Sequence, residues 1–196
     1  APTRHKMPRR IPPVFLEKVW GSTDIEPWFP ARPGLTGEVW FQIEPPLSLL
    51  TKFLFTTDHL SVQVHPNDEY ARVHENGELG KTECWYVIDS IKDAEIIYGH
   101  HAKTKEEFMA MIEKKEWNQL LHRVKVKPGD FFYVPSGTVH AIGKGILILE
   151  TQQNSDTTYR LYDYDRRDSE GNLRDLHLES SIDVIETPCI SNQLTF

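Results

Sequence analysis

The chain has 196 residues, enough for one domain with a substantial core, and its 39% apolar and 26% charged residues are typical of a soluble globular protein. Its formal net charge is −7, and a general nucleic-acid binder needs a basic face, so we expect no nucleic-acid partner. No apolar run approaches the roughly 18 residues of a membrane span, and no apolar signal segment opens the chain, so we expect no membrane partner. Cys84 and Cys189 make no disulfide framework and fit a reducing cytoplasm, the location we expect.

Most of the chain has the pattern of short strands separated by turn residues. Alternating, β-branched and aromatic segments predict strands at residues 38–43, 49–55, 60–65, 83–88, 94–98, 121–126, 131–134, 146–151 and 158–162. The proline-rich residues 27–33 predict a loop, and the tail after Pro188 is either a strand or disordered. Many short strands at this spacing predict a mainly β sandwich or barrel.

Two segments carry helical signals instead. Thr104 to Glu107 forms a T-x-x-E capping box, and the apolar residues Phe108, Met111 and Ile112 follow at helical spacing. The more polar residues 68–79 predict a second helix. We see no internal repeat and no low-complexity linker, so we expect a single domain over residues 1–196.

The strand at residues 60–65 has an unusual polar face. Side chains alternate along a strand, so Ser61, Gln63 and His65 share one face while Val62 and Val64 share the other. Such a polar face indicates either the lining of a pocket or an edge strand with one wet side. The sequence of this segment alone leaves both interpretations open.

Charged residues enter two further strands that are otherwise apolar. Lys81 and Glu83 share a face just before a Trp-Tyr-Val-Ile run, so they are either a solvated pair or a buried pair in need of partners. Glu150 ends the apolar run 146–149 and needs a base or a hydrogen bond there. We expect it to pair with Arg160, ten residues further on; the alternative is a structural ion pair with a neighbouring strand.

The most specific pattern surrounds His140. The spacing Gly129-x5-Pro135-x-Gly137-x2-His140 matches the second motif of the cupins, in which glycines and a proline turn the chain tightly between two strands. The histidine then projects into the mouth of a barrel. This pattern predicts that His140 is a metal ligand.

In combination, residues 61–66, 80–83, 98–101, 135–140 and 159–166 resemble the bacterial type I mannose-6-phosphate isomerases, and the similarity runs from Phe15 to about Glu186. The resemblance implies a cupin, that is, a mainly β jelly-roll barrel with one or two short helices. It also implies metal-dependent interconversion of mannose 6-phosphate and fructose 6-phosphate through an enediol, with a phosphorylated hexose as partner. Longer family members carry a second β-domain after the point where this sequence ends. We therefore expect a short form, a fragment or a chain whose missing half a partner supplies, and homo-oligomer formation stays open.

The resemblance also implies the roles of seven residues, and the expected mechanism adds Lys81 and Glu150 as catalytic candidates. Zinc ligands fall on Gln63, His65, Glu83 and His140, a donor set that leaves iron(II) or manganese open as well. Arg160 is implied as catalytic, with Lys81 and Glu150 beside it, and the substrate phosphate falls near Ser61 and Arg166. The catalytic base stays open between Lys81, Glu150 and a water on the metal.

Three alternatives compete with this interpretation. One is a cupin isomerase acting on another sugar phosphate, the second an iron cupin dioxygenase, and the third a non-catalytic cupin that binds a sugar phosphate. Gln63 together with the basic Lys81 and Arg160 favours isomerisation, because an oxygenase needs open iron positions rather than a phosphate clamp.

Overall fold

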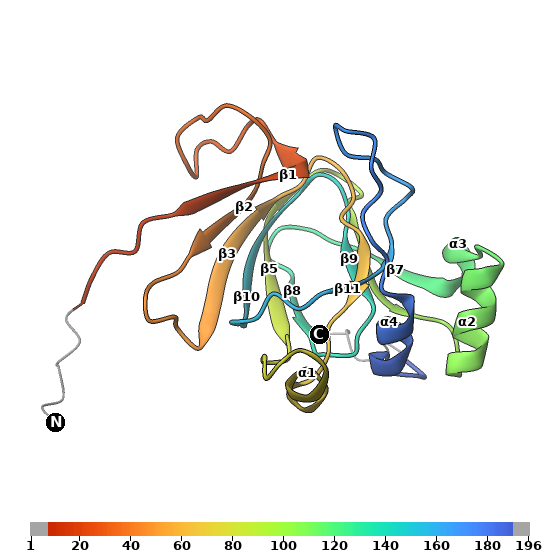
Figure 1. The fold of residues 1–196 in the computed structure, drawn as a ribbon. Helices are drawn as coiled ribbons and strands as arrows, with labels where there is room; N and C mark the ends of the chain where they lie inside the picture. Colours follow the sequence, from red (N-terminus) through yellow and green to blue (C-terminus); the bar gives the residue numbers. More distant parts are fainter. Residues whose placement is uncertain (1–7, 190–196) are drawn as a thin grey trace, which may run out of the picture.

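Two antiparallel sheets face one another in a computed structural model that describes residues 8–189 (Figure 1). One sheet has the order β1-β2-β3-β10-β5-β8 and the other β11-β4-β9-β6-β7. The strands are β1 (Val14–Ser22), β2 (Thr36–Phe41), β3 (Leu49–Phe55), β4 (Val62–Val64), β5 (Glu83–Ser90), β6 (Glu95–His100), β7 (Leu121–Lys125), β8 (Phe131–Val134), β9 (His140–Ile142), β10 (Ile146–Gln153) and β11 (Tyr159–Tyr162). This architecture confirms the expected mainly β jelly-roll barrel.

The nine predicted strands are all present, with ends shifted by at most two residues. β1 and β9 are additional. β9 has only three residues, too few for an alternating pattern to stand out. The pairing of β1 with β2 contains two register shifts. These irregularities interrupt the alternation of inward and outward side chains along β1. The tail after residue 189 lies outside the described residues.

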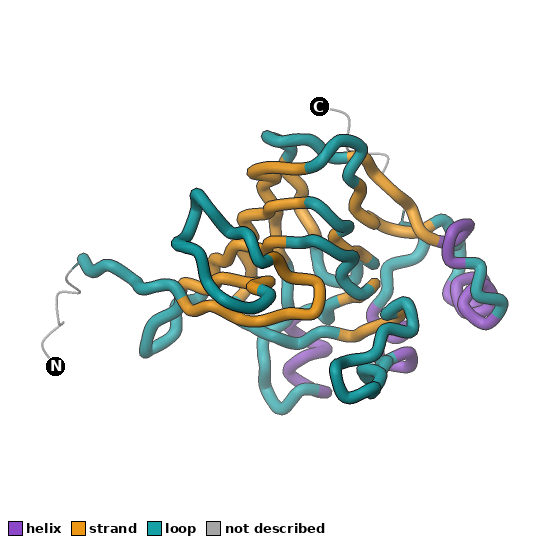
Figure 2. Tube along the Cα trace, turned by 90° about the horizontal axis from the view of Figure 1, so that it is seen from above, coloured by secondary structure: helices purple, strands orange, loops and turns teal. Residues whose placement is uncertain are grey.

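Four helices, α1 (Asp68–His74), α2 (Lys105–Glu113), α3 (Trp117–Leu120) and α4 (Leu178–Val184), lie at the periphery of the strands (Figure 2). The Thr104 hydroxyl accepts a hydrogen bond from the Glu107 amide at 3.1 Å, which confirms the predicted cap of α2. α1 is shorter than predicted because the chain turns into the left-handed region at Asn76 and Gly77. Within residues 8–189, no helix combines the length and apolar character required to span a membrane.

The outer face of the second sheet is apolar because helices cover it. Val62 and Val64 have no exposed surface and belong to a cluster that includes Phe108 of α2 and Leu120 of α3. β4 itself lies between β11 and β9, so it is not an edge strand. The polar face of this segment therefore points into the barrel, and the alternative of a wet edge strand is wrong.

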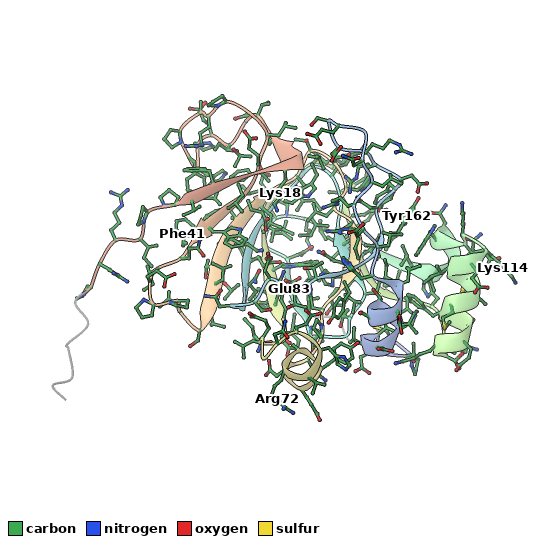
Figure 3. All side chains as sticks on the ribbon, viewed as in Figure 1. Lys18, Phe41, Arg72, Glu83, Lys114 and Tyr162 are labelled. Carbon is green, nitrogen blue, oxygen red and sulfur yellow. The ribbon has the colours of Figure 1, made fainter. Side chains whose placement is uncertain are left out.

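The interior between the sheets is divided into an apolar and a polar part. The apolar part holds large side chains that are less than 10% exposed: Trp20, Leu54, Trp85, Val87, Ile96, Tyr98, Phe132 and Ile148. The polar part holds groups that are at most 3% exposed: Lys52, His65, Glu83, His140 and Glu150. Figure 3 places Glu83 centrally between the two sheets. Ionisable groups buried this deeply need partners, so the polar part marks the candidate site.

Candidate metal centre and substrate cavity

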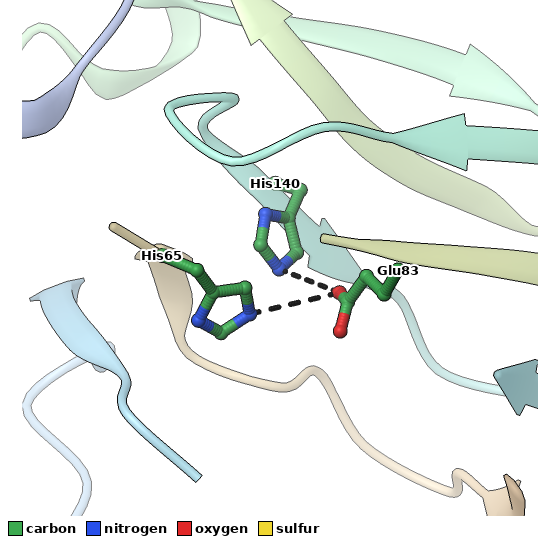
Figure 4. A group of neighbouring side chains, drawn as sticks. All are labelled: His65, Glu83 and His140. Carbon is green, nitrogen blue, oxygen red and sulfur yellow. Dashed lines mark ion pairs between the residues drawn. The ribbon is translucent and has the colours of Figure 1, made fainter. Parts of the chain in front are cut away.

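Three buried side chains from three segments converge in the polar part of the barrel (Figure 4). His65 follows β4, Glu83 opens β5 and His140 opens β9. One potential ligand atom from each lies within 4.8 Å of the other two. Glu83 Oε1 is 3.6 Å from His65 Nε2 and 3.1 Å from His140 Nε2.

The hydrogen bonds of the two imidazoles fix which nitrogen carries the proton. Nδ1 of His65 lies 2.9 Å from the carbonyl oxygen of Thr157, and Nδ1 of His140 lies 2.8 Å from that of Thr138. A carbonyl oxygen only accepts, so each Nδ1 is the donor and each Nε2 of a neutral ring presents a lone pair.

The polar atoms at the centre of the His65, Glu83 and His140 cluster are hydrogen-bond acceptors that no described donor contacts. Both Nε2 atoms and Glu83 Oε2 are buried and have no hydrogen-bond partner among the described residues. Buried acceptors that converge without a donor repel one another unless a cation lies among them. The arrangement therefore fits a divalent metal ion, with each imidazole oriented by a backbone carbonyl behind it.

Burial and charge keep these residues in the forms that bind metal. Burial, reinforced by the charge of Lys81, lowers the pKa of His65 to about 3, so its ring is neutral at neutral pH. Burial alone would raise the pKa of Glu83, but positive charge on His65 and Lys81 holds it well below its usual value. Because His65 is neutral at neutral pH, the positive charge that then acts on Glu83 is that of the Lys81 ammonium, 3.9 Å from Glu83 Oε2. A neutral imidazole and a carboxylate are the ligating forms.

Gln63 is placed to add a fourth donor. It is the direct cross-strand partner of His140, and directly opposite residues project from the same face of a sheet. It precedes His65 by two residues, so these side chains also share a face. The structure thus brings together the four residues that the family resemblance implied as ligands.

The turn before His140 positions two of these residues at once. Gly137 has a φ of +84°, and an added Cβ would meet Glu186 Cγ at 2.9 Å and the carbonyl oxygen of Val184 at 3.0 Å, so only glycine fits. Its amide donates to the carbonyl oxygen of His65 at 2.8 Å. The same tight turn therefore delivers His140 and holds the backbone of His65.

A cavity of about 270 Å³ lies between the sheets beside the cluster. Its lining includes six of the nine residues singled out from the sequence: Ser61, Gln63, Lys81, Glu83, Glu150 and Arg160. The size approaches the lower end of the range for small-molecule sites, and the lining is more charged than most. A small, charged ligand fits such a cavity.

Lys52, which the sequence analysis missed, connects two of the carboxylates in the lining. Its Nζ is 2.8 Å from Glu38 Oε1 and 3.2 Å from Glu150 Oε2, and Lys18 pairs with Glu38 at 3.2 Å. A signal was present in the sequence: a lysine within the mainly apolar run 49–55 indicates a charge on a strand that has to be buried.

The expected pairing of Glu150 with Arg160 is wrong, and the alternative of an ion pair with a neighbouring strand is confirmed. β10 lies between β3 and β5, so the residues opposite Glu150 are Lys52 and Trp85. The Trp85 indole donates to Oε1 at 2.8 Å, whereas the Lys52 ammonium is not aligned to hydrogen-bond Oε2. Burial and the negative charge of Glu83 outweigh Lys52 and raise the pKa of Glu150 to about 7.

Arg160 is held by the backbone instead of a carboxylate. Its Nη1 donates to the carbonyl oxygen of Asp175 at 2.9 Å, and its Nε is buried without a partner among the described residues. Burial and the neighbouring charge of Arg174 both lower the pKa of Arg160. The charges of Asp163 and Asp175 act in the opposite direction, although Arg160 forms no ion pair with either of them.

Arg166 lies outside the cavity lining. It donates to Asp163 Oδ1 at 2.6 Å and also to the carbonyl oxygen of His59, and it is 3.4 Å from Asp58 Oδ2. Asp163 additionally accepts two hydrogen bonds from Arg174, at 2.8 and 2.7 Å. Arg174 does line the cavity. Of the two arginines that bind Asp163, the one expected from the sequence, Arg166, therefore lies outside the cavity and Arg174 lines it.

Comparison with known proteins identifies close relatives, although no family model matches the chain. The mannose-6-phosphate isomerase ManA of Bacillus subtilis is 58% identical over 93% of this chain and 69% of its own length. A mannose-6-phosphate isomerase of Streptococcus mutans is 66% identical over 70% of this chain and 43% of its own length. The crystal structure of a mannose 6-phosphate isomerase from B. subtilis superposes with a TM-score of 0.87 at 43% identity, covering 92% of this chain and 69% of that one.

Proposed function

The chain belongs to the mannose-6-phosphate isomerase family, and from this membership we propose that it interconverts mannose 6-phosphate and fructose 6-phosphate. The observation that carries the proposal is the group of converging acceptors on His65, Glu83 and His140 at the wall of a charged cavity. This is the arrangement that a metal-dependent aldose–ketose isomerase requires.

Isomerisation moves a proton between C1 and C2 of the open-chain sugar through an enediol. The reaction needs a base near both carbons and positive charge near their oxygens. A divalent ion held by Gln63, His65, Glu83 and His140 would supply Lewis-acid polarisation of those oxygens. The Lys81 ammonium, buried next to Glu83, adds a fixed positive charge at the same wall.

Two residues of the chain can carry the proton. Glu150 is one candidate, because its buried carboxylate lines the cavity beside the cluster. Lys81 lines the same cavity and is the alternative base. We assign Arg160 to the stabilisation of developing negative charge, because its Nε is a buried donor without an acceptor.

We propose zinc as the metal. Two imidazole nitrogens, a carboxylate and an amide oxygen form a four-donor set that suits Zn²⁺, while iron(II) and manganese accept similar ligands. The carbonyl behind each imidazole fixes the ring in the orientation that such a site uses.

A coupled assay tests the proposal by following the formation of fructose 6-phosphate from mannose 6-phosphate. We expect turnover that is lost with a strong chelator and restored by zinc, with iron(II) and manganese as parallel additions. Full turnover after complete metal removal would contradict the role of the metal. Stoichiometric metal without turnover on any hexose phosphate would favour the non-catalytic sugar-phosphate-binding alternative.

A further inference from the structure

Trp85 connects the apolar part of the interior to the Glu150 carboxylate. Its indole is 1% exposed and belongs to the apolar cluster between the sheets, with Phe132 as its cross-strand partner on β8. Its partner on β10 is Glu150, so these two side chains project from the same face of the sheet. The indole Nε1 donates to Glu150 Oε1 at 2.8 Å, and both side chains line the cavity.

The charges on either side of β10 pull the Glu150 carboxylate away from Trp85. Lys52 on β3 attracts it, with Nζ 3.2 Å from Oε2, and Glu83 on β5 repels it. β3 and β5 flank β10, so attraction and repulsion both act in the direction of β3. Lys81, which precedes β5, pulls the other way, but its effect on Glu150 is smaller than that of Lys52. Lys52 also pairs with Glu38 at 2.8 Å, which fixes the ammonium on its own side of the cavity.

The indole N–H is the one hydrogen-bond donor that reaches the Glu150 carboxylate within residues 8–189. Glu150 Oε2 makes no hydrogen bond there, although it is buried. The last torsion angle of a glutamate is soft, and an ion pair constrains it less than a directional hydrogen bond does. The orientation of this carboxylate therefore depends on Trp85, which lies on the β5 side and opposes the pull of Lys52.

The same indole packs against a proposed metal ligand. Its ring centroid is 5.5 Å from that of His140, with the two planes at 65°. One rigid, buried side chain thus contacts His140 through its ring and Glu150 through its N–H. Side chains that are locked by packing in this way hold the groups of a site at fixed separations.

We infer that Trp85 is the positioning residue for Glu150, and that its indole N–H holds the carboxylate on the β5 side of the cavity, beside the metal cluster. The inference rests on the proposed function for the part that Glu150 takes in proton transfer. The indole exchanges no proton with the sugar and acts only through Glu150.

Replacement of Trp85 by benzothienylalanine tests the inference, because a sulfur atom takes the place of the N–H while the fused rings keep nearly the same shape. With mannose 6-phosphate as substrate, kcat is expected to fall about ten- to a hundredfold, the effect of losing a hydrogen bond to a charged group. KM and metal content should stay within about twofold, because the packing on His140 is retained. An unchanged kcat would assign Trp85 to packing alone and overturn the inference.

The same replacement at Trp117 is the matched control. Trp117 stacks on Tyr162 with ring centroids 4.5 Å apart and does not line the cavity. Its variant should keep the wild-type kcat, and a loss equal to that of the Trp85 variant would attribute the effect to the unnatural side chain and overturn the inference.

Glu150→Gln shows whether Trp85 acts through Glu150. Once the carboxylate is gone, loss of the indole N–H should cost no further turnover, so the doubly changed protein should be as slow as Glu150→Gln alone. A second loss of the same size in the doubly changed protein would make the two effects independent and refute the positioning role.

Crystal structures separate failure of the inference from failure of the proposed function. In the benzothienylalanine variant we expect the Glu150 carboxylate to turn toward Lys52. A carboxylate that keeps its wild-type position overturns the inference, whether or not the wild type turns over. If the carboxylate turns but the wild type does not isomerise mannose 6-phosphate, the positioning role stands and the proposed function fails.

Discussion

His65 and His140 owe their ligating form to backbone carbonyls. The carbonyl oxygens of Thr157 and Thr138 take the Nδ1 protons, which leaves both Nε2 lone pairs directed at Glu83. A carboxylate in the carbonyl positions would favour a charged imidazolium ring, whereas a neutral carbonyl orients the ring without charging it. The tautomer needed for metal binding is thus fixed before any ion arrives.

Replacement of a ligand tests this cluster directly. His140→Ala removes one of the converging lone pairs, and we expect the purified protein to lose most of its metal and its turnover. Elemental analysis by mass spectrometry measures the metal-to-protein ratio. His101→Ala, in an exposed histidine outside the cluster, is the control and should retain full occupancy. Equal metal content in both variants would contradict the assignment.

Arg160→Ala separates electrostatic catalysis from metal binding. Among the described residues, the guanidinium group makes no hydrogen bond or ion pair with His65, Glu83 or His140, so metal content should stay at the wild-type level. Turnover should fall about a hundredfold or more, as when one preorganised donor is removed from an active site. Near-normal kcat in a metal-replete variant would refute the catalytic role of Arg160.

At the scale of elements, β10 joins the two halves of the larger sheet because it pairs with both β3 and β5. Its inward residues include Ile148, which is fully buried in the apolar part of the interior, and Glu150, which faces the cavity. One strand therefore serves both the core and the site.

Ile148→Ala should lower the free energy of unfolding by about 3 kcal/mol, the usual cost of the cavity left by a buried isoleucine. Urea denaturation monitored by circular dichroism measures it. The control is Leu49→Ala on the neighbouring β3, where the side chain is 54% exposed and the cost should stay within about 0.5 kcal/mol. Similar losses in the two variants would show that β10 does not anchor the core.

The connection between β11 and α4 is held by the Asp163 carboxylate. Burial alone would raise the pKa of Asp163, but hydrogen bonds from Arg174 and Arg166 lower it below its usual value. The folded protein therefore binds this proton more weakly than the unfolded chain does. The resulting stabilisation is complete above the unfolded pKa of about 3.9 and is lost as the pH falls through the folded value.

Asp163→Asn should lower the free energy of unfolding by about 2 kcal/mol at neutral pH, and this difference from wild type should shrink on acidification below about pH 4. Denaturation curves between pH 3 and pH 7 measure the difference. Asp165→Asn is the control, because Asp165 is exposed and asparagine tolerates its φ of 53°. A difference that is constant over this pH range would contradict the ion-pair origin.

At the scale of the whole molecule, metal binding should be coupled to folding. A ligand that binds only the folded state stabilises it by mass action, so zinc at a hundredfold excess over its Kd should raise the melting temperature by about 5–10 °C relative to chelated protein. Differential scanning calorimetry measures the shift. The melting temperature of His140→Ala should not respond to the chelator, and an equal response would place the stabilising ion elsewhere.

The strands and the proposed metal-binding residues could be predicted from the sequence, because the strands alternate regularly and the residues lie in or next to them. Alternation along residues 60–65 already placed Gln63 and His65 on one face, and the turn before His140 carries a distinctive spacing. The partner of Glu150 was not predictable in this way, since it depends on which strand pairs with β10 far away in the chain. Arg174 was missed for a related reason: it lies in an irregular segment, and only the folded chain brings it to Asp163 and the cavity.

The turn at Gly137 has a consequence for how the two layers of the barrel are joined. Its amide bonds the backbone of His65 and its chain continues directly into His140, so these ligands move as one body with the second sheet. Glu83 belongs to the first sheet. An ion held by His65, Glu83 and His140 would therefore connect the two sheets at this wall of the cavity.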